Sequence, residues 1–579
     1  MSKVARTGRA IGSWLTGVIC CCLLLVPLAS CNTPQGPDTS LQPTPLDLGI
    51  PAESLKSPVT GPLAGDTKLH VRITFKIDPN LLNQSQQQTM QPGQSSHLEQ
   101  FANKIGIDDA KYQKIKAFFH TQGIDINLSQ LRTHLAIEAK ASTLARLLQT
   151  DFVVHNYNGK SFYAPDTNKP AKVPQFLANS IDAITGLDNY SAVPKQDLHF
   201  NVQQPAQPAA DCSPQDQTLL PKEIAHTYGF DQLWNRGLHG ENMTINLVEI
   251  DGSYRDDIQN YFDCIQFKGK LTTVNVDGSP KEALGESTLD IQMVAGLARS
   301  SNIKVYQTDA SDQNSDVWVN VNDELQQLLN DNVNNANSGN VVSISLGAAE
   351  GEMTTSDVKA IDSSLRQLSQ VEHLAVFVAS GDCGAFTSRR YGDLSVSFPA
   401  SDPWSISVGG TILRIDQNAN RVSEGAWSEQ AGSQCQNNWG SGGGNSKLYQ
   451  RSNWQKAPGV DNRYSQGRRQ VPDVSAVAYG LAVYFQGQWG AVGGTSASAP
   501  IWATGLALVN QQLAQRSHKV SSTPDLFYKA ATQNNGKHPY YDVTQGDNLY
   551  YKATSGWDYA TGLGTLNLPD FADTVGKLT

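Results

Sequence analysis

Two different patterns of apolar and polar residues divide the chain into two parts. In the first third, "KLHVRITFKID" (residues 68–78) alternates apolar and polar positions as a half-buried strand does. Further along, "DDAKYQKIKAFFHTQG" and "ASTLARLLQ" repeat apolar residues at helical spacing. Up to "VPQFLANSIDAITGLDNY", these patterns predict a small α+β domain.

After Cys212 the apolar residues come in continuous runs. Five runs, separated by helix-like segments, are "MTINLVEI", "NIKVYQT", "NVVSISLG", "LAVFVASG" and "WSISVGG". Continuous apolar strands that alternate with helices are typical of a parallel sheet covered by helices on both faces. We therefore predict an α/β domain whose functional groups gather at the carboxyl ends of its strands.

The N-terminus has the pattern of an export signal. Lys3, Arg6 and Arg9 precede the apolar run "WLTGVICCCLLLVPLAS", which is too short for a typical membrane-spanning helix. The run ends in "LASC", followed by polar residues, and resembles a bacterial lipoprotein box in which Cys31 becomes the lipid-carrying first mature residue. A plain signal peptide cut nearby is the alternative. Either way we expect an extracellular or cell-surface protein.

Two stretches rich in Pro, Ser, Thr and Gln separate these units. Residues 32–62 have little to bury and predict a disordered tether, and "VPKQDLHFNVQQPAQPAADCSP" predicts an exposed linker that a peptidase could cut. The predicted organisation is a signal peptide (1–30), a tether (31–64), the α+β domain (65–190), a linker (191–211) and the α/β domain (212–579).

Composition narrows the class of partner. The formal net charge of -10 argues against nucleic acid, because phosphate binding needs clustered Lys and Arg. Only 17% of residues are charged, which is compatible with an acidic medium, although a neutral secreted surface is equally compatible.

The cysteines predict disulfides. Of the eight, Cys20, Cys21 and Cys22 leave with the signal, and four follow Cys31. An even number in an exported chain favours Cys212 with Cys264 and Cys383 with Cys435, although three pairings are possible. None has the close spacing of a zinc site.

Two short stretches predict chemistry. In "GGTSASAP" (residues 493–500), Ser496 stands at the start of a buried helix among small residues, so its hydroxyl is a candidate nucleophile; the alternative is a helix cap. In "GESTLDIQMVAG" (residues 285–296), Glu286 and Asp290 are four apart and share one helix face among apolar neighbours. A carboxylate can serve as the base for a serine hydroxyl in an acidic medium.

These stretches resemble the sedolisins, or serine-carboxyl peptidases, in their kumamolisin-like branch. A subtilisin would carry a His before the same Val-Ala-Gly, whereas this helix matches the sedolisin pattern Glu-x-x-x-Asp. Other sedolisin-like segments follow in the expected order: "LVEIDGSY", "VSISLG", "VASGDCGA", "FPASDPWSISVGGT", "GSGGGNS", "RRQVPDVSAVA" and "GWDYATGLGTLN". The resemblance implies a subtilisin-like parallel sheet, and an activation prodomain in residues 65–190.

The resemblance also implies the roles of the acids. Glu286 would be the general base for Ser496, and Asp290 would hold Glu286 through a short hydrogen bond that shares a proton. Asp382, in "FVASGDCGA", would be a protonated donor to the oxyanion together with the N–H of Ser496. In some relatives a Glu on the early strand and an aromatic extend this chain of acids; here Glu249 is present, but Leu346 replaces the aromatic.

A calcium site is expected near the C-terminus. "YYDVTQGDN" and "TSGWDYATGLG" place Asp542 and Asp558 beside Gly-rich backbone, an oxygen-only set suited to Ca²⁺. The resemblance implies that one structural ion is bound by two carboxylates and three carbonyls, from Asp542, Val543, Thr554, Gly556 and Asp558. Thr554 stands where the family usually has Gly, which is tolerable only if the local backbone admits a side chain.

The sequence therefore predicts a secreted, acid-active, monomeric endopeptidase that cleaves proteins or peptides and is made as a self-processing zymogen inhibited by its own prodomain. A tripeptidyl-peptidase of the same family is one alternative, and a non-catalytic, calcium-stabilised surface-binding protein on this fold is another. A subtilisin-type peptidase active at neutral pH is disfavoured, since none of the histidines of the exported chain has the required neighbours.

Overall fold

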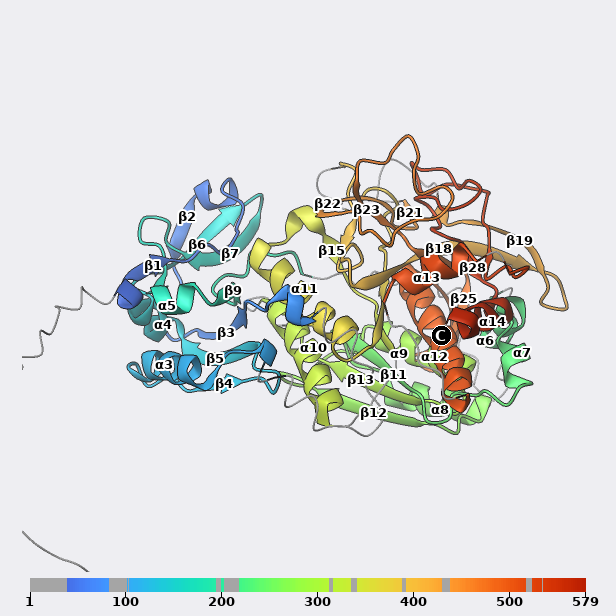
Figure 1. Cartoon of the computed structure of the whole chain (residues 1–579), viewed down its shortest axis with the longest axis horizontal. Helices are drawn as coiled ribbons and strands as arrows, with labels where there is room; N and C mark the ends of the chain where they lie inside the picture. The colour runs from blue at the N-terminus through green and yellow to red at the C-terminus, as the bar shows by residue number, and fades with distance from the viewer. Residues whose placement is uncertain are drawn as a thin grey trace, which may run out of the picture.

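The structure, a computed structural model, describes residues 39–82, 102, 104–193, 199–201, 218–311, 316–334, 341–387, 392–429, 438–516, 523–533 and 535–578. An N-terminal domain, up to residue 193, lies beside a larger C-terminal domain that begins at residue 218 (Figure 1). The predicted signal, Cys31, tether residues 32–38, most of the linker, Cys212 and Cys435 fall outside the described residues. The prediction that residues 32–62 form a disordered tether is wrong for the described part, because β1 (Pro43–Pro45) pairs with β8 (Lys172–Pro174) and β2 (Val59–Pro62) pairs with β6 (Phe152–Tyr157), so these residues belong to the N-terminal domain. Cys264 and Cys383 are disulfide-bonded, and their pairing with Cys212 and Cys435 stays a prediction.

The N-terminal domain is built on an antiparallel sheet in the order β4-β5-β3-β9. The predicted alternating strand is its β3, Lys68–Phe75, and the predicted helices are α3 and α4. The strands are β1 (Pro43–Pro45), β2 (Val59–Pro62), β3, β4 (Ile126–Leu128), β5 (His134–Lys140), β6 (Phe152–Tyr157), β7 (Lys160–Pro165), β8 (Lys172–Pro174) and β9 (Ile181–Thr185). The helices are α3 (Asp109–His120), α4 (Ala141–Leu147) and α5 (Gln175–Ala178).

The C-terminal domain contains the predicted, mostly parallel sheet, in the order β12-β13-β11-β14-β16-β18-β19, with β24 beside β18. All five predicted apolar runs are strands of this sheet and pair in parallel with one another. Its strands are β11 (Thr244–Glu249), β12 (Lys270–Asn275), β13 (Asn302–Gln307), β14 (Val341–Ile344), β16 (Ala375–Ala379), β18 (Ser405–Ile415), β19 (Arg421–Ala426) and β24 (Val474–Val477). Only β19 is antiparallel to its neighbour in this sheet.

Helices cover both faces of the sheet. The helices are α6 (Pro221–Tyr228), α7 (Phe230–Trp234), α8 (Arg255–Ile265), α9 (Glu286–Leu297), α10 (Val317–Asn334), α11 (Thr355–Gln370), α12 (Thr495–Gln515), α13 (Asp525–Ala531) and α14 (Leu568–Leu578). Along β16, Phe377 belongs to the core cluster of α9 and α12, whereas Val376 and Val378 belong to that of α10 and α11. Successive residues of one strand thus point into opposite layers. This confirms the predicted fold class.

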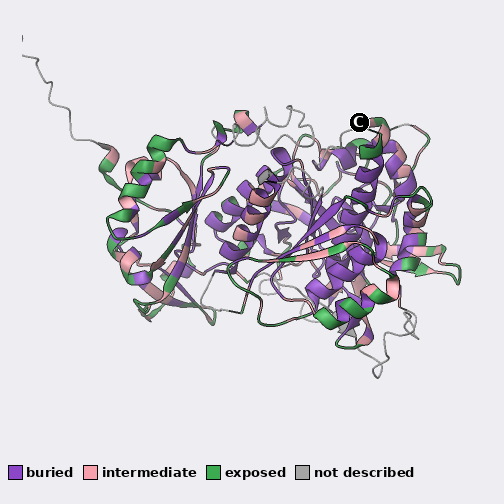
Figure 2. Cartoon of the chain, turned by 90° about the horizontal axis from the view of Figure 1, so that it is seen from below, coloured by how far each residue is buried: buried purple, intermediate pink, exposed green. Residues whose placement is uncertain are grey.

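The two helices that matter most for function are buried on all sides. Every residue of α9 is buried, and so is α12 from Thr495 to Leu513 (Figure 2). A helix that is apolar around its whole circumference belongs inside a large domain. The polar groups that these helices carry are therefore shielded from bulk water.

Smaller strands surround the central sheet. They are β15 (Ala348–Ala349), β17 (Ser397–Phe398), β20 (Ser428–Glu429), β21 (Trp439–Gly440), β22 (Gly444–Gln450), β23 (Arg468–Val471), β25 (Leu481–Phe485), β26 (Gln488–Gly493), β27 (Tyr540–Tyr541) and β28 (Thr565–Leu566). β10 (His199–Asn201), from the linker, pairs antiparallel with β26. In the described part of the chain, no helix has the length and apolar character needed to cross a bilayer.

The two domains meet at α10 and α11. Arg72 of β3 is 5% exposed and forms an ion pair with Asp323 of α10, with 2.8 Å and 2.7 Å from its Nε to the two carboxylate oxygens. On β5, His134 is buried beside Gln326 of α10. Leu131 of the N-terminal domain packs in the same apolar cluster as residues of α10 and α11. The interface therefore combines apolar packing with buried polar pairs.

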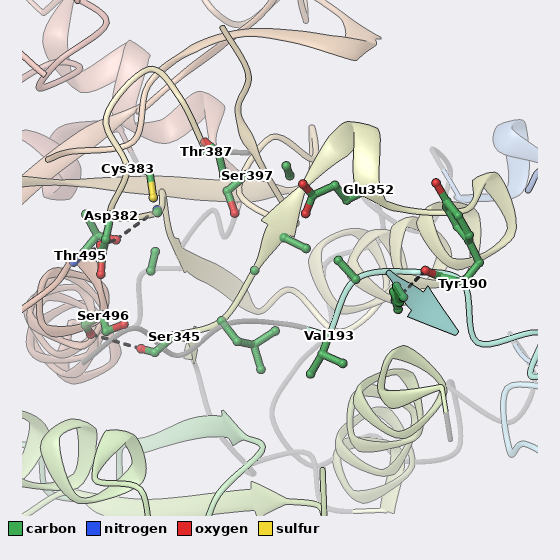
Figure 3. Close-up of a pocket in the computed structure, with 18 of the residues that line it drawn as sticks. Tyr190, Val193, Ser345, Glu352, Asp382, Cys383, Thr387, Ser397, Thr495 and Ser496 are labelled. Carbon is green, nitrogen blue, oxygen red and sulfur yellow. Dashed lines mark hydrogen bonds between the residues drawn. The ribbon is translucent and has the colours of Figure 1, made fainter. Parts of the chain in front are cut away.

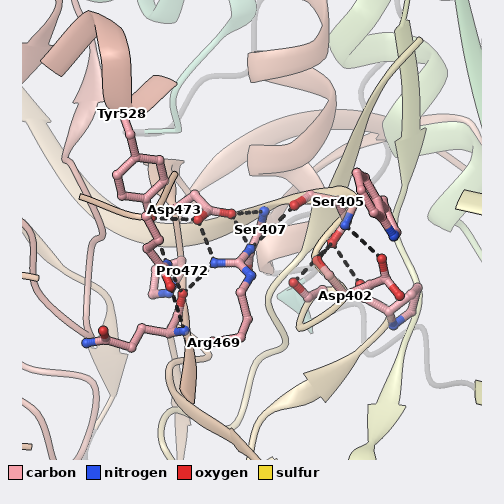
Figure 4. Close-up of polar contacts among 12 residues, drawn as sticks. Asp402, Ser405, Ser407, Arg469, Pro472, Asp473 and Tyr528 are labelled. Carbon is pink, nitrogen blue, oxygen red and sulfur yellow. Dashed lines mark hydrogen bonds and ion pairs between the residues drawn. The ribbon is translucent and has the colours of Figure 1, made fainter. Parts of the chain in front are cut away.

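A second buried ion pair ties the C-terminal domain together (Figure 4). The Arg469 guanidinium donates to both oxygens of Asp473, at 2.7 Å and 2.6 Å, and both side chains are fully buried. Asp473 also accepts from the hydroxyl of Tyr528 on α13 and from the N–H of Ser407 on β18. The charge of Asp473 thus links three separate segments.

Candidate active site

The N-terminus of α9 brings Glu286 into the interior. Gly285, which precedes the helix, has a φ of 113°, a conformation that glycine adopts without strain. The carboxylate of Asp251 caps this turn: it accepts from the N–H groups of Leu284 and Gly285, at 2.9 Å each, and of Ser287, at 3.1 Å. These bonds satisfy N–H groups that a helix start leaves unpaired.

Asp290 lies one turn further along α9 and is also fully buried. Its Oδ2 accepts a hydrogen bond of 2.6 Å from the Ser345 hydroxyl. Its carboxyl also shares a hydrogen bond with Glu249, which follows from the position of Glu249 at the end of β11. Asp290 is therefore held from two neighbouring strands of the sheet.

The expected short hydrogen bond between Glu286 and Asp290 is not formed. Among the described residues, neither oxygen of Glu286 has a partner in full hydrogen-bond geometry. The two carboxyls act on each other through charge, because the negative charge of Asp290 raises the pKa of Glu286. Spacing along the helix places both acids on one face, but Ser345 and Glu249 supply the hydrogen bonds to Asp290.

Burial dominates the acid–base properties of this group. It raises the pKa of Glu286 well above its ordinary value, and the charges of Asp290, Asp251 and Asp382 add to this effect. Burial likewise raises the pKa of Asp290 and Glu249. Several carboxyls in one apolar site cannot all ionise cheaply, so they hold protons together and titrate as a unit.

Ser496 is the second residue of α12 and faces this group. It is 5% exposed, and its hydroxyl lies close enough to Glu286 to lower the pKa of that carboxyl. As one of the first residues of the helix, it has an N–H without an acceptor in the preceding turn. Ser498, in contrast, donates its hydroxyl to the backbone oxygens of Ala476 and Val477. Of the two serines, only Ser496 lies beside the acids.

Asp382 binds Thr495, the residue that precedes Ser496. It follows β16, and its Oδ1 accepts from both the N–H of Thr495, at 2.8 Å, and the Thr495 hydroxyl, at 2.7 Å. A Cβ placed on Gly494 would lie 3.1 Å from the other oxygen of Asp382, which explains why a glycine precedes the helix. The structure therefore brings the four predicted residues, Glu286, Asp290, Asp382 and Ser496, to one end of the sheet.

A cleft of about 420 Å³ opens onto Ser496 and Asp382 (Figure 3). Ser345 and Ser496 face one another at one end, and Tyr190 and Val193 of the N-terminal domain close the other. The chain leaving that domain is tied down in the cleft, because the N–H of Ala192 donates to the carbonyl of Glu352 at 2.8 Å. The N-terminal domain thus forms part of the wall.

Linker residues 199–201 form a strand close to Ser496. In β10, His199 is paired with Gly493 and Asn201 with Ala491, so this strand runs beside the residues that lead into Ser496. Residues 194–198 lie outside the described residues. The two described segments of the linker, 191–193 and 199–201, are therefore both held next to the site.

The predicted metal-binding residues also lie together. Asp542 accepts from the N–H of Gly556 at 3.0 Å, and Asp558 accepts from the N–H of Thr554 at 2.9 Å, so both carboxylates border one turn. Val543, which would offer its carbonyl, is buried directly after Asp542. Thr554 is not among the residues with positive φ, so its side chain causes no strain. This oxygen-rich donor set fits Ca²⁺.

Metal binding here would depend on backbone carbonyls. Within the described residues, no group of three or more His, Cys, Asp or Glu side chains is arranged to hold a metal ion. The predicted set uses two carboxylates and three carbonyls, which agrees with that observation.

Two contributors to the site were not predicted. Asp251 caps the turn that carries Glu286, and Ser345 binds Asp290. Both directly follow apolar strands, in "LVEID" and "SIS", where functional groups of parallel sheets gather. A position after a buried strand indicates a possible functional residue. It does not distinguish Asp251 and Ser345 from other polar residues at strand ends.

Comparison with known proteins places this geometry in context. Residues 56–190 match the pro-kumamolisin activation domain, and residues 278–556 match the subtilase family. Kumamolisin from Bacillus sp. (strain MN-32) is 26% identical over 550 residues, which cover 87% of this chain and 91% of the relative. Tripeptidyl-peptidase sed1 from Aspergillus fumigatus is 25% identical over 583 residues, covering 83% and 87%.

A solved structure extends the likeness. Pseudomonas sedolisin, a serine-carboxyl proteinase complexed with pseudo-iodotyrostatin, is 26% identical with a TM-score of 0.54 and covers 63% of this chain and 99% of its own. The fold and the matches define a serine-type peptidase of subtilisin-like fold behind an activation domain. Within that class, the chain is similar over most of its length to the serine-carboxyl peptidases kumamolisin and sedolisin.

Proposed function

We propose that this protein is an acid-active endopeptidase in which Ser496 attacks the peptide carbonyl and Glu286 accepts its proton. The observation that carries the proposal is that Ser496 and Asp382 open onto one cleft, while the Ser496 hydroxyl lies close to the carboxyl of Glu286. Glu286 must be ionised to act as a base. Because burial raises its pKa, activity should rise with pH above the ordinary range of a glutamate.

In this proposal Asp382 stabilises the tetrahedral intermediate. Its protonated carboxyl would donate to the oxyanion together with the N–H of Ser496. An ionised carboxylate there would repel the developing charge, so activity should fall once Asp382 loses its proton. The general acid step follows by return of the proton from Glu286 to the leaving amine. Asp290 acts on this cycle through its charge.

The N-terminal domain would act as an intramolecular inhibitor. Its residues 190–193 run through the cleft, and Lys160 donates to the carbonyls of Tyr190 and Ser191 at 2.8 Å each, which fixes this segment. A substrate cannot occupy the same space. We infer that cleavage of the linker, within residues 191–211, releases the mature enzyme.

Calcium would stabilise the C-terminal loops. Asp542 and Asp558 with the carbonyls of Val543, Thr554 and Gly556 would hold one ion, which would neutralise the carboxylates and lock the turn between them. Export through the N-terminal signal, with a lipid at Cys31, would place the enzyme outside the cell or on its surface. Mass spectrometry of the mature N-terminus tests the lipid directly.

One experiment tests the function. The purified precursor and its Ser496→Ala variant are acidified and then assayed on a peptide library between about pH 3 and 8. The wild type should process its linker and cleave internal bonds at acidic pH, and the variant should do neither. Release of tripeptides from free N-termini would favour the tripeptidyl mode. Efficient self-cleavage by the variant, or no cleavage by the wild type, contradicts the proposal.

A further inference from the structure

We propose that Ser345 is a positioning residue of the peptidase reaction, whose single hydroxyl fixes Asp290 and the first turn of the catalytic helix in one relation to each other. This inference rests on the proposed function, since it assigns a role within that reaction. Two independent observations carry it: the position of Ser345 between the two groups, and a gap in the hydrogen bonding of α12.

Ser345 lies at the end of a central strand of the sheet. It follows β14, which lies between β11 and β16. The register pairs Ile344 of β14 with Val248 of β11, so Ser345 and Glu249 are neighbours at the carboxyl ends of adjacent strands. Ser345 is 1% exposed. Its hydroxyl therefore works inside the protein, where hydrogen bonds to charged groups are strong.

The hydroxyl lies within reach of two acceptors. One is Oδ2 of Asp290 at 2.6 Å, and the other is the carbonyl oxygen of Ser496 at 3.1 Å (Figure 3). A hydroxyl carries one proton and can donate to one of them at a time. When Asp290 is ionised, the shorter bond takes the proton; when Asp290 is protonated, it can donate to Ser345, which then donates to Ser496.

The helix itself explains why the carbonyl of Ser496 needs a donor. In an α-helix this oxygen accepts from the N–H four residues on, but residue 500 is Pro500, which has no N–H. A buried carbonyl without a partner is costly. Ser345 supplies the donor that Pro500 lacks. The same hydroxyl thus satisfies the backbone of the nucleophile and the carboxyl of Asp290.

Among the described residues, the titratable groups that act on Asp290 and Glu286 from the surrounding elements are acids. Glu249 from β11 shares a hydrogen bond with Asp290, and Asp251 acts on Asp290 through its charge. Glu286 faces the same site from α9, and its own pKa responds to the charges of Asp290 and Asp382. Burial raises the pKa of Asp290, and the hydrogen bonds from Ser345 and Glu249 oppose this rise; of these two donors, Ser345 alone carries no charge of its own.

The consequence is a defined effect on the pH profile. Removing the donor should raise the pKa of Asp290 and make the ionised form of the Glu286 and Asp290 group rarer at acidic pH. The acidic limb of kcat/KM should then move upward by about one pH unit, the scale on which a hydrogen bond to a carboxylate acts. A purely structural residue would lower activity without moving that limb.

The test compares four forms of the full chain after acid processing. Ser345→Ala should show the shifted limb, and Ser345→Thr, which keeps the hydroxyl, should restore it. Ser343→Ala is the matched control, because Ser343 lies two residues earlier, on β14, is fully buried, and has a hydroxyl without a hydrogen-bond partner among the described residues. Its limb should stay with the wild type.

If Ser345→Ala does not fold, a double variant still tests the proposal. Ser345→Ala with Pro500→Ala regains the helical N–H for Ser496 while still lacking the donor to Asp290, so it should fold and keep the shifted limb. The inference is overturned if either Ser345 variant lacking the hydroxyl shares the limb of Ser343→Ala. Absence of activity in the wild type would instead overturn the proposed function.

Discussion

Arg72 of the N-terminal domain binds Asp323 of the C-terminal domain at the centre of their interface. Arg72 is 5% exposed and Asp323 is 14% exposed, so neither charge is freely solvated. Glu138, on the neighbouring strand, adds a contact of 3.0 Å to the same guanidinium. The surroundings of the pair are largely apolar. Either charge would therefore be destabilised there without its partner.

Breaking this pair should loosen the precursor. Arg72→Met leaves Asp323 without its cation, and removal of one partner from a buried ion pair costs roughly 3–5 kcal/mol. In a chain that also carries Ser496→Ala to prevent cleavage, we expect a lower melting temperature, measured by calorimetry. Asp109→Ala is the control, because the ion pair of Asp109 with Arg132 is largely exposed and should contribute little. Equal melting temperatures for the two would contradict a structural role for Arg72.

His134 should make docking of the N-terminal domain sensitive to acid. Its Nδ1 lies 3.2 Å from the Thr133 hydroxyl, which donates to Gln367, and its Nε2 lies 3.5 Å from the amide nitrogen of Gln326. A proton on Nε2 would face that N–H donor. Burial lowers the pKa of His134 to about 3, from an ordinary 6.5.

The sign of the effect follows from the lowered pKa. The docked form excludes the proton, so the contribution of His134 to docking is complete above pH 6.5 and is lost as the pH falls toward 3. His134→Gln should therefore lengthen the lag before peptidase activity appears after acidification. His120→Gln is the control, since His120 is exposed at the end of α3. A lag unchanged by His134→Gln would exclude this histidine as an acid trigger.

Two substitutions of Asp382 test its proposed role as a hydrogen-bond donor to the oxyanion. Asp382→Ala should fold and lose about 10²–10³ in kcat, the usual effect of removing one oxyanion donor. Asp382→Asn keeps an N–H donor that does not ionise, so its residual activity should persist at a pH where the wild type declines. Steady-state kinetics across the pH range give both results. A wild-type kcat in the alanine variant would refute the role.

Removal of calcium should lower stability without altering the active site directly. At a free Ca²⁺ concentration of 100 times the dissociation constant, binding contributes about 2.7 kcal/mol to stability. We expect a chelator to lower the melting temperature by several degrees and Ca²⁺ to restore it. Asp558→Asn should abolish the response to the chelator, whereas Mg²⁺ should not replace Ca²⁺. A melting temperature independent of Ca²⁺ would count against this site.

The buried pair Arg469 and Asp473 should be essential for the C-terminal domain. Arg469→Met strands the charge of Asp473, which would keep only neutral donors such as the hydroxyl of Tyr528. We expect a loss of roughly 3–5 kcal/mol in the free energy of unfolding, measured with denaturant. The double variant Arg469→Met with Asp473→Leu should recover part of that loss, because no buried charge remains.

Much of this architecture could be predicted from residue pattern. The five apolar runs became parallel strands because a strand buried on both faces has no polar positions to alternate. Ser496 and Glu286 could be placed near each other because their two motifs resemble those of the sedolisins. The donors to the acids were harder to predict: Ser345 reaches Asp290 from a strand 55 residues away in sequence.

The acid–base properties could not be predicted from the sequence. An isolated glutamate predicts a base with an ordinary pKa, but Glu286 is completely buried and faces the charges of Asp251 and Asp382 from other strands. The expected bond between Glu286 and Asp290 failed for the same reason, since partners from β11 and β14 compete for Asp290. Helical spacing predicts which residues share one face of a helix. It does not predict which groups from other elements pack against that face.

The pairing of β10 with β26 has a kinetic consequence. Linker residues 199–201 lie beside the strand that leads into Ser496, while Ala192 anchors the start of the linker to Glu352 in the cleft. If the bond cut first lies between these anchors, enzyme and substrate are the same molecule, so the half-life of the precursor should not change on dilution.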